Sequence, residues 1–408
     1  RYITVYHTIF LSEILLKKRN ICYDNFMKTI EYSIEHNKTK DLSLFFEHPE
    51  DVLFFDIETT GFSPRGASIY LIGCAYFGAS GWQTKLFFAE TPAEEGEILR
   101  AFLSFAHTFS YFVHFNGTTF DIPFLQAKCK KHALPSFSPQ SQCDIYKRIS
   151  PYKNLLHLPG CRQKQLEEYT GIYREDRFNG GQLIELYRAF CEAPDERLLQ
   201  VLLLHNREDL EGMAQLFPVM AVPALFKGGY FSVEEAAVEK DASRDAAAPC
   251  SLSVFLRPAF SLPAPLSVHG FSGLLKKCFL AGKERSVLLR IPLYEGELKY
   301  FYPDYKNYSY LPAEDNAIHK SVAVYVDKSQ RMPATAATCY TRKAGSFLPC
   351  FTSMDEVGLP RFRADYKDKQ LWIMVDDLLN ADADTRNAYV KSVLWALVKT
   401  KPEPKTKQ

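Results

Sequence analysis

The chain has 408 residues, which is long enough for two or three domains. Hydrophobic residues make up 47% and charged residues 24% of it, and these values exclude a protein that is disordered throughout. The net charge of +1 gives no sign of a strongly basic nucleic-acid-binding protein. Any nucleic-acid function must therefore be argued from local features of the sequence.

Ten cysteines are scattered along the chain without a C-x-x-C pair, so the sequence offers no paired ligands for structural zinc. We interpret them as reduced thiols of a cytoplasmic protein. No run approaches the roughly 18 apolar residues of a membrane span, and the first 20 residues lack a signal-peptide cleavage site. One interpretation, left open here, starts the native product at Met27 and excludes residues 1–26.

The chain begins with polar residues and then turns apolar. Residues 28–50 are polar and charged with a weak helical pattern, and we interpret residues 1–50 as an N-terminal extension. An apolar run over 52–55 that ends at Asp56 predicts the first strand of a globular domain. Two further strands, over 68–77 and 83–88, complete a predicted three-strand meander.

Helical patterns alternate with one more strand after this meander. Apolar residues at helical spacing predict helices over 94–107 and 120–132, with a strand over 111–115 between them. Adjacent strands followed by helix, strand and helix indicate a mixed α/β sheet rather than a purely parallel one. Further helices are predicted over 163–170, 182–191 and 196–216.

A change of composition separates a second region from the first. Residues 234–248 are rich in alanine and charge, so we interpret 227–250 as a linker. Residues 251–400 then form a predicted smaller α+β, β-rich domain of unknown role, and the tail 401–408 is predicted to be disordered. Its expected strands are 251–255, 286–292, 297–302, 321–327 and 334–342, closed by a helix over 385–398.

Asp56 and Glu58 stand two residues apart at the end of the first strand, so their side chains point to the same face. Two carboxylates this close repel each other and favour protonation. A divalent cation removes the conflict, and oxygen ligands suit Mg²⁺ or Mn²⁺. The competing interpretation is a solvated strand end, because D-x-E occurs by chance in many proteins.

Two more acidic positions are candidates. Asp121 follows a strand and opens a helix, where it either stabilises the helix dipole or joins a metal site. His205 and Asp209 are four residues apart on a predicted helix and share a face. They form either a helix salt bridge or a metal ligand beside a proton acceptor. Glu208 is the alternative ligand if the register slips by one residue.

The order and context of these motifs resemble the DEDD superfamily of ribonuclease H-like 3′→5′ exonucleases. DIETTG at residues 56–61 is similar to that superfamily's first motif. Residues 51–213 resemble bacterial ribonuclease H-like domain proteins, with further matches at 164–167 and 174–180. The resemblance implies a ribonuclease H-like domain over residues 51–226, built on a mixed five-stranded sheet flanked by helices.

The resemblance also implies a two-metal hydrolytic site for Mg²⁺ or Mn²⁺. Asp56, Glu58 and Asp209 would hold one ion, and Asp56 and Asp121 would share the second. His205 would orient or deprotonate the attacking water. The superfamily places a tyrosine four residues, or a histidine five residues, before the last aspartate. His205 stands four residues before Asp209, which leaves its role as general base open.

Substrate contacts are expected from positions near these motifs. Between residues 128 and 177, ten Lys and Arg residues stand against five acids, with tyrosines interleaved. Cations and rings of this kind suit a groove for single-stranded nucleic acid, although a solvated charged surface is an equal alternative. The candidate substrate-binding residues are Thr59, Thr60, Asn116, Lys164 and Arg174.

The leading interpretation is a metal-dependent 3′→5′ exonuclease that acts on ends of single-stranded DNA or RNA. A structure-selective endonuclease on the same fold and a catalytically silent nucleic-acid-binding module are the alternatives. All four expected carboxylates are present, which weighs against the silent module. The Tyr-rich run over 300–310 either extends the nucleic-acid surface or packs within a sheet. The oligomeric state is left open.

Overall fold

A computed structural model describes residues 20–24, 27–39, 42–175, 178–240, 250–271, 273–351 and 358–399. The chain divides into two compact units. The first unit contains residues 1–153 and 158–220, and the second contains residues 154–157 and 221–408. The expected tail 401–408 and most of residues 1–26 lie outside the described residues.

The first unit is built on a seven-stranded sheet with the order β1-β2-β5-β4-β3-β6-β7. Strands β3, β4 and β5 pair antiparallel, whereas β3, β6 and β7 pair in parallel. The sheet is therefore mixed, as predicted, but it has two strands more than the five expected. Its strands are β1 (Asn20–Asp24), β2 (Met27–Ser33), β3 (Val52–Thr59), β4 (Ile69–Gly78), β5 (Gly81–Phe88), β6 (Tyr111–His114) and β7 (Ser141–Asp144).

The interpretation of residues 1–50 as an extension was wrong for β2, which pairs with β5 from Lys28 to Ser33. Ile30 and Tyr32 are buried with 1% and 7% exposure, while Glu31 between them pairs with Lys85 at 3.0 Å. This alternation of period two is typical of a strand, and the polar composition of the segment concealed it. Strand β2 thus extends the sheet on the β5 side.

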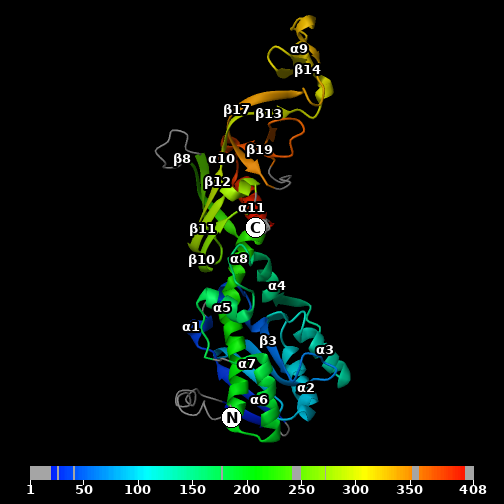
Figure 1. Cartoon of the computed structure of the whole chain (residues 1–408), viewed down its shortest axis with the longest axis vertical. Helices are drawn as coiled ribbons and strands as arrows, with labels where there is room; N and C mark the ends of the chain where they lie inside the picture. The colour runs from blue at the N-terminus through cyan, green and yellow to red at the C-terminus, as the bar shows by residue number, and fades with distance from the viewer. Residues whose placement is uncertain are drawn as a thin grey trace, which may run out of the picture. The chain divides into compact units, whose positions relative to one another are not determined.

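Helices cover both faces of this sheet (Figure 1). Leu53, Phe55 and Ile57 of β3 join one core cluster with α2 and α3. The alternate residues of β3 face the other way, where α7 packs along β3, β4 and β5. Asp56 and Glu58 therefore point toward α7. The helices are α1 (His36–Thr39), α2 (Glu95–Ala106), α3 (Asp121–Lys131), α4 (Ile145–Ile149), α5 (Gln163–Thr170), α6 (Gly180–Glu192) and α7 (Glu196–Leu216).

The second unit is rich in strands, as predicted. One sheet has the order β10-β11-β12-β9-β8, a small closed sheet joins β13, β17, β19 and β18, and a third has the order β15-β14-β16. Its strands are β8 (Phe231–Lys240), β9 (Cys250–Pro258), β10 (Leu262–His269), β11 (Phe279–Glu284), β12 (Ser286–Pro292), β13 (Tyr294–Phe301), β14 (Tyr308–Leu311), β15 (Asn316–His319), β16 (Met332–Pro333), β17 (Tyr340–Cys350), β18 (Phe362–Arg363) and β19 (Leu371–Met374). Its helices are α8 (Ala221–Pro223), α9 (Lys320–Ala323), α10 (Val375–Leu379) and α11 (Ala383–Lys399).

Three expectations for this unit need correction. The linker assigned to 227–250 contains β8, whose residues Phe231–Lys240 pair with β9. The strand expected over 321–327 is replaced by α9 and a turn, because His319 caps the helix by accepting from the backbone N–H of Ser321. Of the strand expected over 334–342, only the part from Tyr340 belongs to β17.

The tyrosines between residues 300 and 310 pack within the second unit. Tyr302 and Tyr308 stack with ring centroids 4.5 Å apart, and Tyr300 contacts Phe362 at 5.8 Å. These contacts favour the sheet-packing interpretation over a nucleic-acid surface. No helix within the described part of the chain is long and apolar enough to cross a membrane.

Candidate active site

The two acids of β3 meet side chains of α7. The strand continues through Asp56 and Glu58 to Thr59 instead of ending at Asp56. Asp56 accepts a hydrogen bond from Asn206 Nδ2 at 2.8 Å. Glu58 Oε1 lies 3.5 Å from His205 Nε2, and the Glu58 side chain is only 12% exposed. A solvated strand end does not describe this pair.

Helix α7 supplies the next acid. His205 and Asp209 share a face, as their spacing predicts, with His205 Nε2 3.2 Å from Asp209 Oδ2. One ligand atom from each of Glu58, His205 and Asp209 lies within 4.8 Å of the others. Glu208 accepts instead from the backbone N–H of Glu175 at 3.3 Å. The geometry therefore favours Asp209 over Glu208 as the acidic member of the cluster.

Asp121 reaches the same place from another element. It is the first residue of α3 and is 5% exposed. Its Oδ1 accepts a hydrogen bond from the backbone N–H of Ile57 at 3.3 Å, between the two acids of β3. Asp121 is therefore tied to β3 as well as placed at a helix N-terminus.

The carboxylates perturb one another strongly. Burial, and then the charges of Asp121, Glu58 and Asp209, raise the pKa of Asp56 well above its ordinary range. Burial raises the pKa of Glu58 to about 7, although His205 opposes the change. Burial also raises the pKa of Asp121 to about 7, against the hydrogen bonds that it accepts from the backbone. Acids with such close, buried neighbours must bind protons or a cation near neutral pH.

The donor set fits a divalent metal of the hard kind. Asp56, Glu58, Asp121 and Asp209 contribute carboxylate oxygens, the ligands that Mg²⁺ and Mn²⁺ prefer. The clustered negative charges would offset the two positive charges of a divalent ion. The site therefore suits the predicted ions, while their number and identity stay predictions.

Asn206 is a residue of this site that the sequence motifs did not indicate. Its side chain is fully buried, and its Oδ1 has no hydrogen-bond partner within the described residues. It packs over Gly73 of β4, where an added Cβ would lie 1.8 Å from Asn206 Oδ1. The available signal was a polar residue in the buried stripe of α7, and its partner Asp56 lies 150 positions away in sequence.

Four of the candidate substrate-binding residues form hydrogen bonds with nearby parts of the chain. Thr59 Oγ1 donates to the Gly61 carbonyl at 2.8 Å, and Thr60 Oγ1 accepts from the Ser68 backbone N–H at 2.8 Å. Asn116 has a φ of 60° and accepts from Thr119 Oγ1 at 2.7 Å. Lys164 Nζ donates to the Phe178 carbonyl at 3.1 Å. Their contacts with substrate stay predictions.

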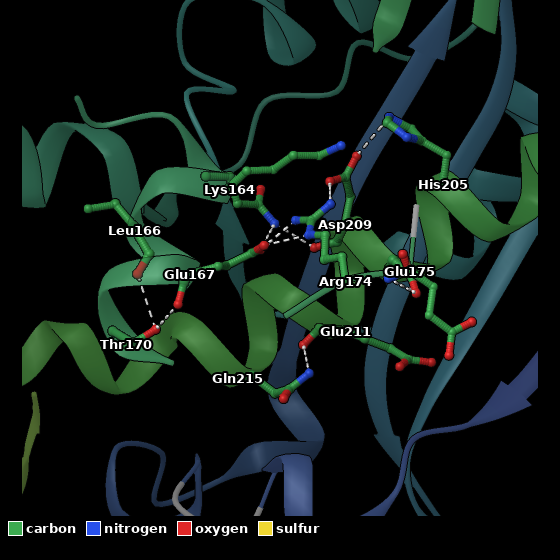
Figure 2. Close-up of polar contacts among 12 residues, drawn as sticks. Lys164, Leu166, Glu167, Thr170, Arg174, Glu175, His205, Asp209, Glu211 and Gln215 are labelled. Carbon is green, nitrogen blue, oxygen red and sulfur yellow. Dashed lines mark hydrogen bonds and ion pairs between the residues drawn. The ribbon is translucent and has the colours of Figure 1, made fainter. Parts of the chain in front are cut away.

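Arg174, the fifth candidate substrate-binding residue, is buried and paired with acids. Its guanidinium forms ion pairs with Glu167 and Asp209, and its side chain is 7% exposed (Figure 2). A buried, doubly paired arginine presents little of its charge to a nucleic-acid strand. The structure thus connects Arg174 to the acidic cluster instead of to a surface groove.

The basic stretch between residues 128 and 177 is only partly at the surface. Lys128 is buried beside Glu95 at 3.0 Å, and Lys131 contacts the same carboxylate at 2.9 Å. Tyr173 is 86% exposed, and Arg177 lies outside the described residues. The exposed basic residues are Lys130, Lys131, Lys147, Arg148, Lys153 and Arg162.

A comparison with protein families identifies the fold. Residues 53–221 match the RNase_H_2 model, which is described as RNase_H superfamily. These residues form an RNase H-like domain. The match begins within β3 and ends just after α7, so it includes all four clustered carboxylates of the domain. It does not extend to the β-rich second unit.

Solved structures of a DNA polymerase and an exonuclease overlap with the chain at low identity. A family B DNA polymerase from the archaeon Pyrobaculum calidifontis is 18% identical, with a TM-score of 0.35 over 42% of this chain and 25% of the polymerase. E. coli exonuclease I in complex with a 5cy-dA13 oligonucleotide is 14% identical, with a TM-score of 0.26 over 51% of this chain and 54% of the exonuclease. The chain thus spans about a quarter and about half of these two proteins. A search of the curated proteins returned no match.

Proposed function

We propose that the RNase H-like domain is a metal-dependent 3′→5′ exonuclease of the DEDD type that hydrolyses phosphodiester bonds of single-stranded DNA or RNA. The observation that carries the proposal is the convergence of Asp56, Glu58, Asp121 and Asp209 on the α7 side of the sheet. Burial of four acids in one place is costly unless cations bind there.

Two ions would each be bound by a different set of these acids. Asp56, Glu58 and Asp209 would hold one, and Asp56 with Asp121 would hold the other. Bound ions of this kind supply a hydroxide nucleophile at neutral pH and stabilise the leaving 3′ oxygen. Asn206 donates to Asp56 Oδ2 and so keeps that carboxylate in one orientation. The hydrogen bond from Ile57 N–H does the same for Asp121.

His205 would accept or donate a proton in this reaction. Its Nε2 lies 3.2 Å from Asp209 Oδ2 and 3.5 Å from Glu58 Oε1, at the edge of the acidic cluster. A proton accepted at Nε2 would leave an imidazolium between two carboxylates, which stabilise its charge. The spacing of four residues from His205 to Asp209 does not prevent this contact, since both lie on one face of α7.

The test is digestion of 5′-labelled single-stranded DNA and RNA with Mg²⁺ or Mn²⁺. The variants are Asp56→Asn and, as a matched control, Asp51→Asn, which changes an exposed aspartate just before β3. We expect a ladder that shortens from the 3′ end with wild type and the control. Asp56→Asn should lose on the order of a hundredfold in rate or more, because several kcal/mol of charge stabilisation depend on the ions and each 1.4 kcal/mol is tenfold.

Other products would support the alternatives. Cleavage of a circular single strand would indicate an endonuclease on the same fold. Binding of either strand without any metal-dependent product would overturn the enzyme and leave a nucleic-acid-binding module.

A further inference from the structure

An ion-pair network joins α5, the segment after it and α7 behind the acidic cluster (Figure 2). Arg174 lies between Glu167 of α5 and Asp209 of α7. The side chains of Glu167 and Arg174 are 1% and 7% exposed, and that of Asp209 is 18% exposed. The network therefore excludes most solvent and borders the proposed metal centre.

The two oxygens of Asp209 have different partners. Arg174 Nε and Nη2 donate to the two oxygens of Glu167, while Arg174 Nη1 donates to Asp209 Oδ1. Asp209 Oδ2 faces His205 Nε2 at 3.2 Å, on the side of Glu58. One oxygen is thus held by the guanidinium, and the other points into the cluster.

Neighbouring residues keep the arrangement in place. Gln163 Nε2 donates to Glu167 Oε1 at 2.9 Å and to the Asp209 carbonyl at 2.7 Å. Gly212, one turn after Asp209, leaves the room that Glu167 fills, since a Cβ there would lie 2.3 Å from Glu167 Oε1. A guanidinium that donates to two carboxylates through its planar set of N–H groups has few alternative positions.

We propose that Arg174, anchored by Glu167, is a positioning residue that fixes Asp209 with Oδ2 directed at the metal. The inference rests on the metal centre of the proposed function. Outer hydrogen bonds of this kind orient ligating side chains, and their loss typically lowers metal affinity or activity about 10- to 100-fold. Because Glu167 neutralises Arg174, the pair orients Asp209 without adding a net positive charge that would repel a cation.

The double variant Glu167→Gln/Arg174→Gln tests this role most cleanly. It removes one negative and one positive charge, so the net charge is unchanged, and it leaves no buried unpaired glutamate. Arg174→Lys keeps the charge but loses the fork. Arg188→Gln is the matched control, because Arg188 is 60% exposed and pairs with Glu185 on the same helix, α6.

Titration calorimetry with Mn²⁺ gives a readout that does not depend on catalysis. We expect the double variant to bind Mn²⁺ about 10- to 100-fold more weakly than wild type, with Arg174→Lys between them and Arg188→Gln unchanged. Thermal unfolding checks that each variant is folded. In the nuclease assay, activity should need more Mn²⁺ while the KM for the oligonucleotide stays the same.

The opposite pattern would overturn the inference. Unchanged Mn²⁺ affinity with a raised KM would make Arg174 a substrate-binding residue, and unchanged values of both would leave a structural ion pair. A wild type that binds no Mn²⁺ would also overturn it. If wild type binds Mn²⁺ but cleaves neither DNA nor RNA, the proposed function fails while the positioning role is still decided by calorimetry.

Discussion

Replacing Glu58 by glutamine should stabilise the metal-free domain at alkaline pH. The folded-state pKa of Glu58 is raised from 4.5 to about 7, mainly by burial. A carboxyl group with a raised folded pKa contributes stability below its unfolded pKa, and this contribution is lost as the pH rises through the folded pKa. The wild-type domain in a chelator should therefore lose stability between about pH 5 and pH 8.

The size of the effect follows from the same values. One pKa unit corresponds to about 1.4 kcal/mol, so ionising Glu58 in the folded domain costs on the order of 3 kcal/mol above pH 7. Glutamine carries no charge at any pH and avoids this cost. Glu58→Gln should thus be more stable than wild type at pH 8 by up to about 3 kcal/mol, with little difference at pH 5.

Hydrogen exchange followed by mass spectrometry on peptides of β3 measures this locally, without a contribution from the second unit. At pH 8 in chelator, exchange in β3 should be slower in Glu58→Gln than in wild type by up to roughly a hundredfold. Glu50→Gln is the control, since Glu50 is 61% exposed. Equal exchange rates at pH 8, or a difference just as large at pH 5, would refute the reasoning.

Three further changes test other parts of the site. Gly73→Ala should displace Asn206 and cost about 1–3 kcal/mol of unfolding free energy, whereas Gly66→Ala, which has no atom within 4 Å of the added Cβ, should not; chemical denaturation measures both. His205→Ala should lower kcat by about 10²–10⁴-fold without raising the Kd for Mn²⁺ to a similar degree; equal losses in both would make His205 a ligand instead of a proton acceptor. Mn²⁺ at about a hundred times its Kd should stabilise wild type by roughly 2.7 kcal/mol in thermal unfolding, and Asp121→Asn should show a clearly smaller gain; identical gains would remove Asp121 from the site.

Most of the correct predictions for the first unit came from local sequence patterns. The period of two along β3 places Asp56 and Glu58 on one face, and the spacing of four places His205 and Asp209 on one face of α7; the structure has both arrangements. The helices α2, α3, α5 and α7 follow their apolar spacing closely. That these segments meet depends on the fold, which the resemblance supplied and the family match supports.

The errors have a different physical origin. Strands β2 and β8 are rich in polar and charged residues, so their pairing with β5 and β9 depends on partners that a local pattern does not reveal. The run 321–327 is apolar enough for a strand, yet Tyr325 is 89% exposed and no strand forms there. Arg174 shows the same limit, since a basic residue near a site suggests substrate binding until its acidic partners are known.

Crystals soaked with Mn²⁺ and measured for anomalous scattering would test the metal centre most directly. The account predicts anomalous density among Asp56, Glu58, Asp121 and Asp209, with Asp209 Oδ2 facing an ion and Oδ1 still held by Arg174. Anomalous density confined to other places, or none at these four residues when Mn²⁺ is well above the concentration that supports cleavage, would contradict it.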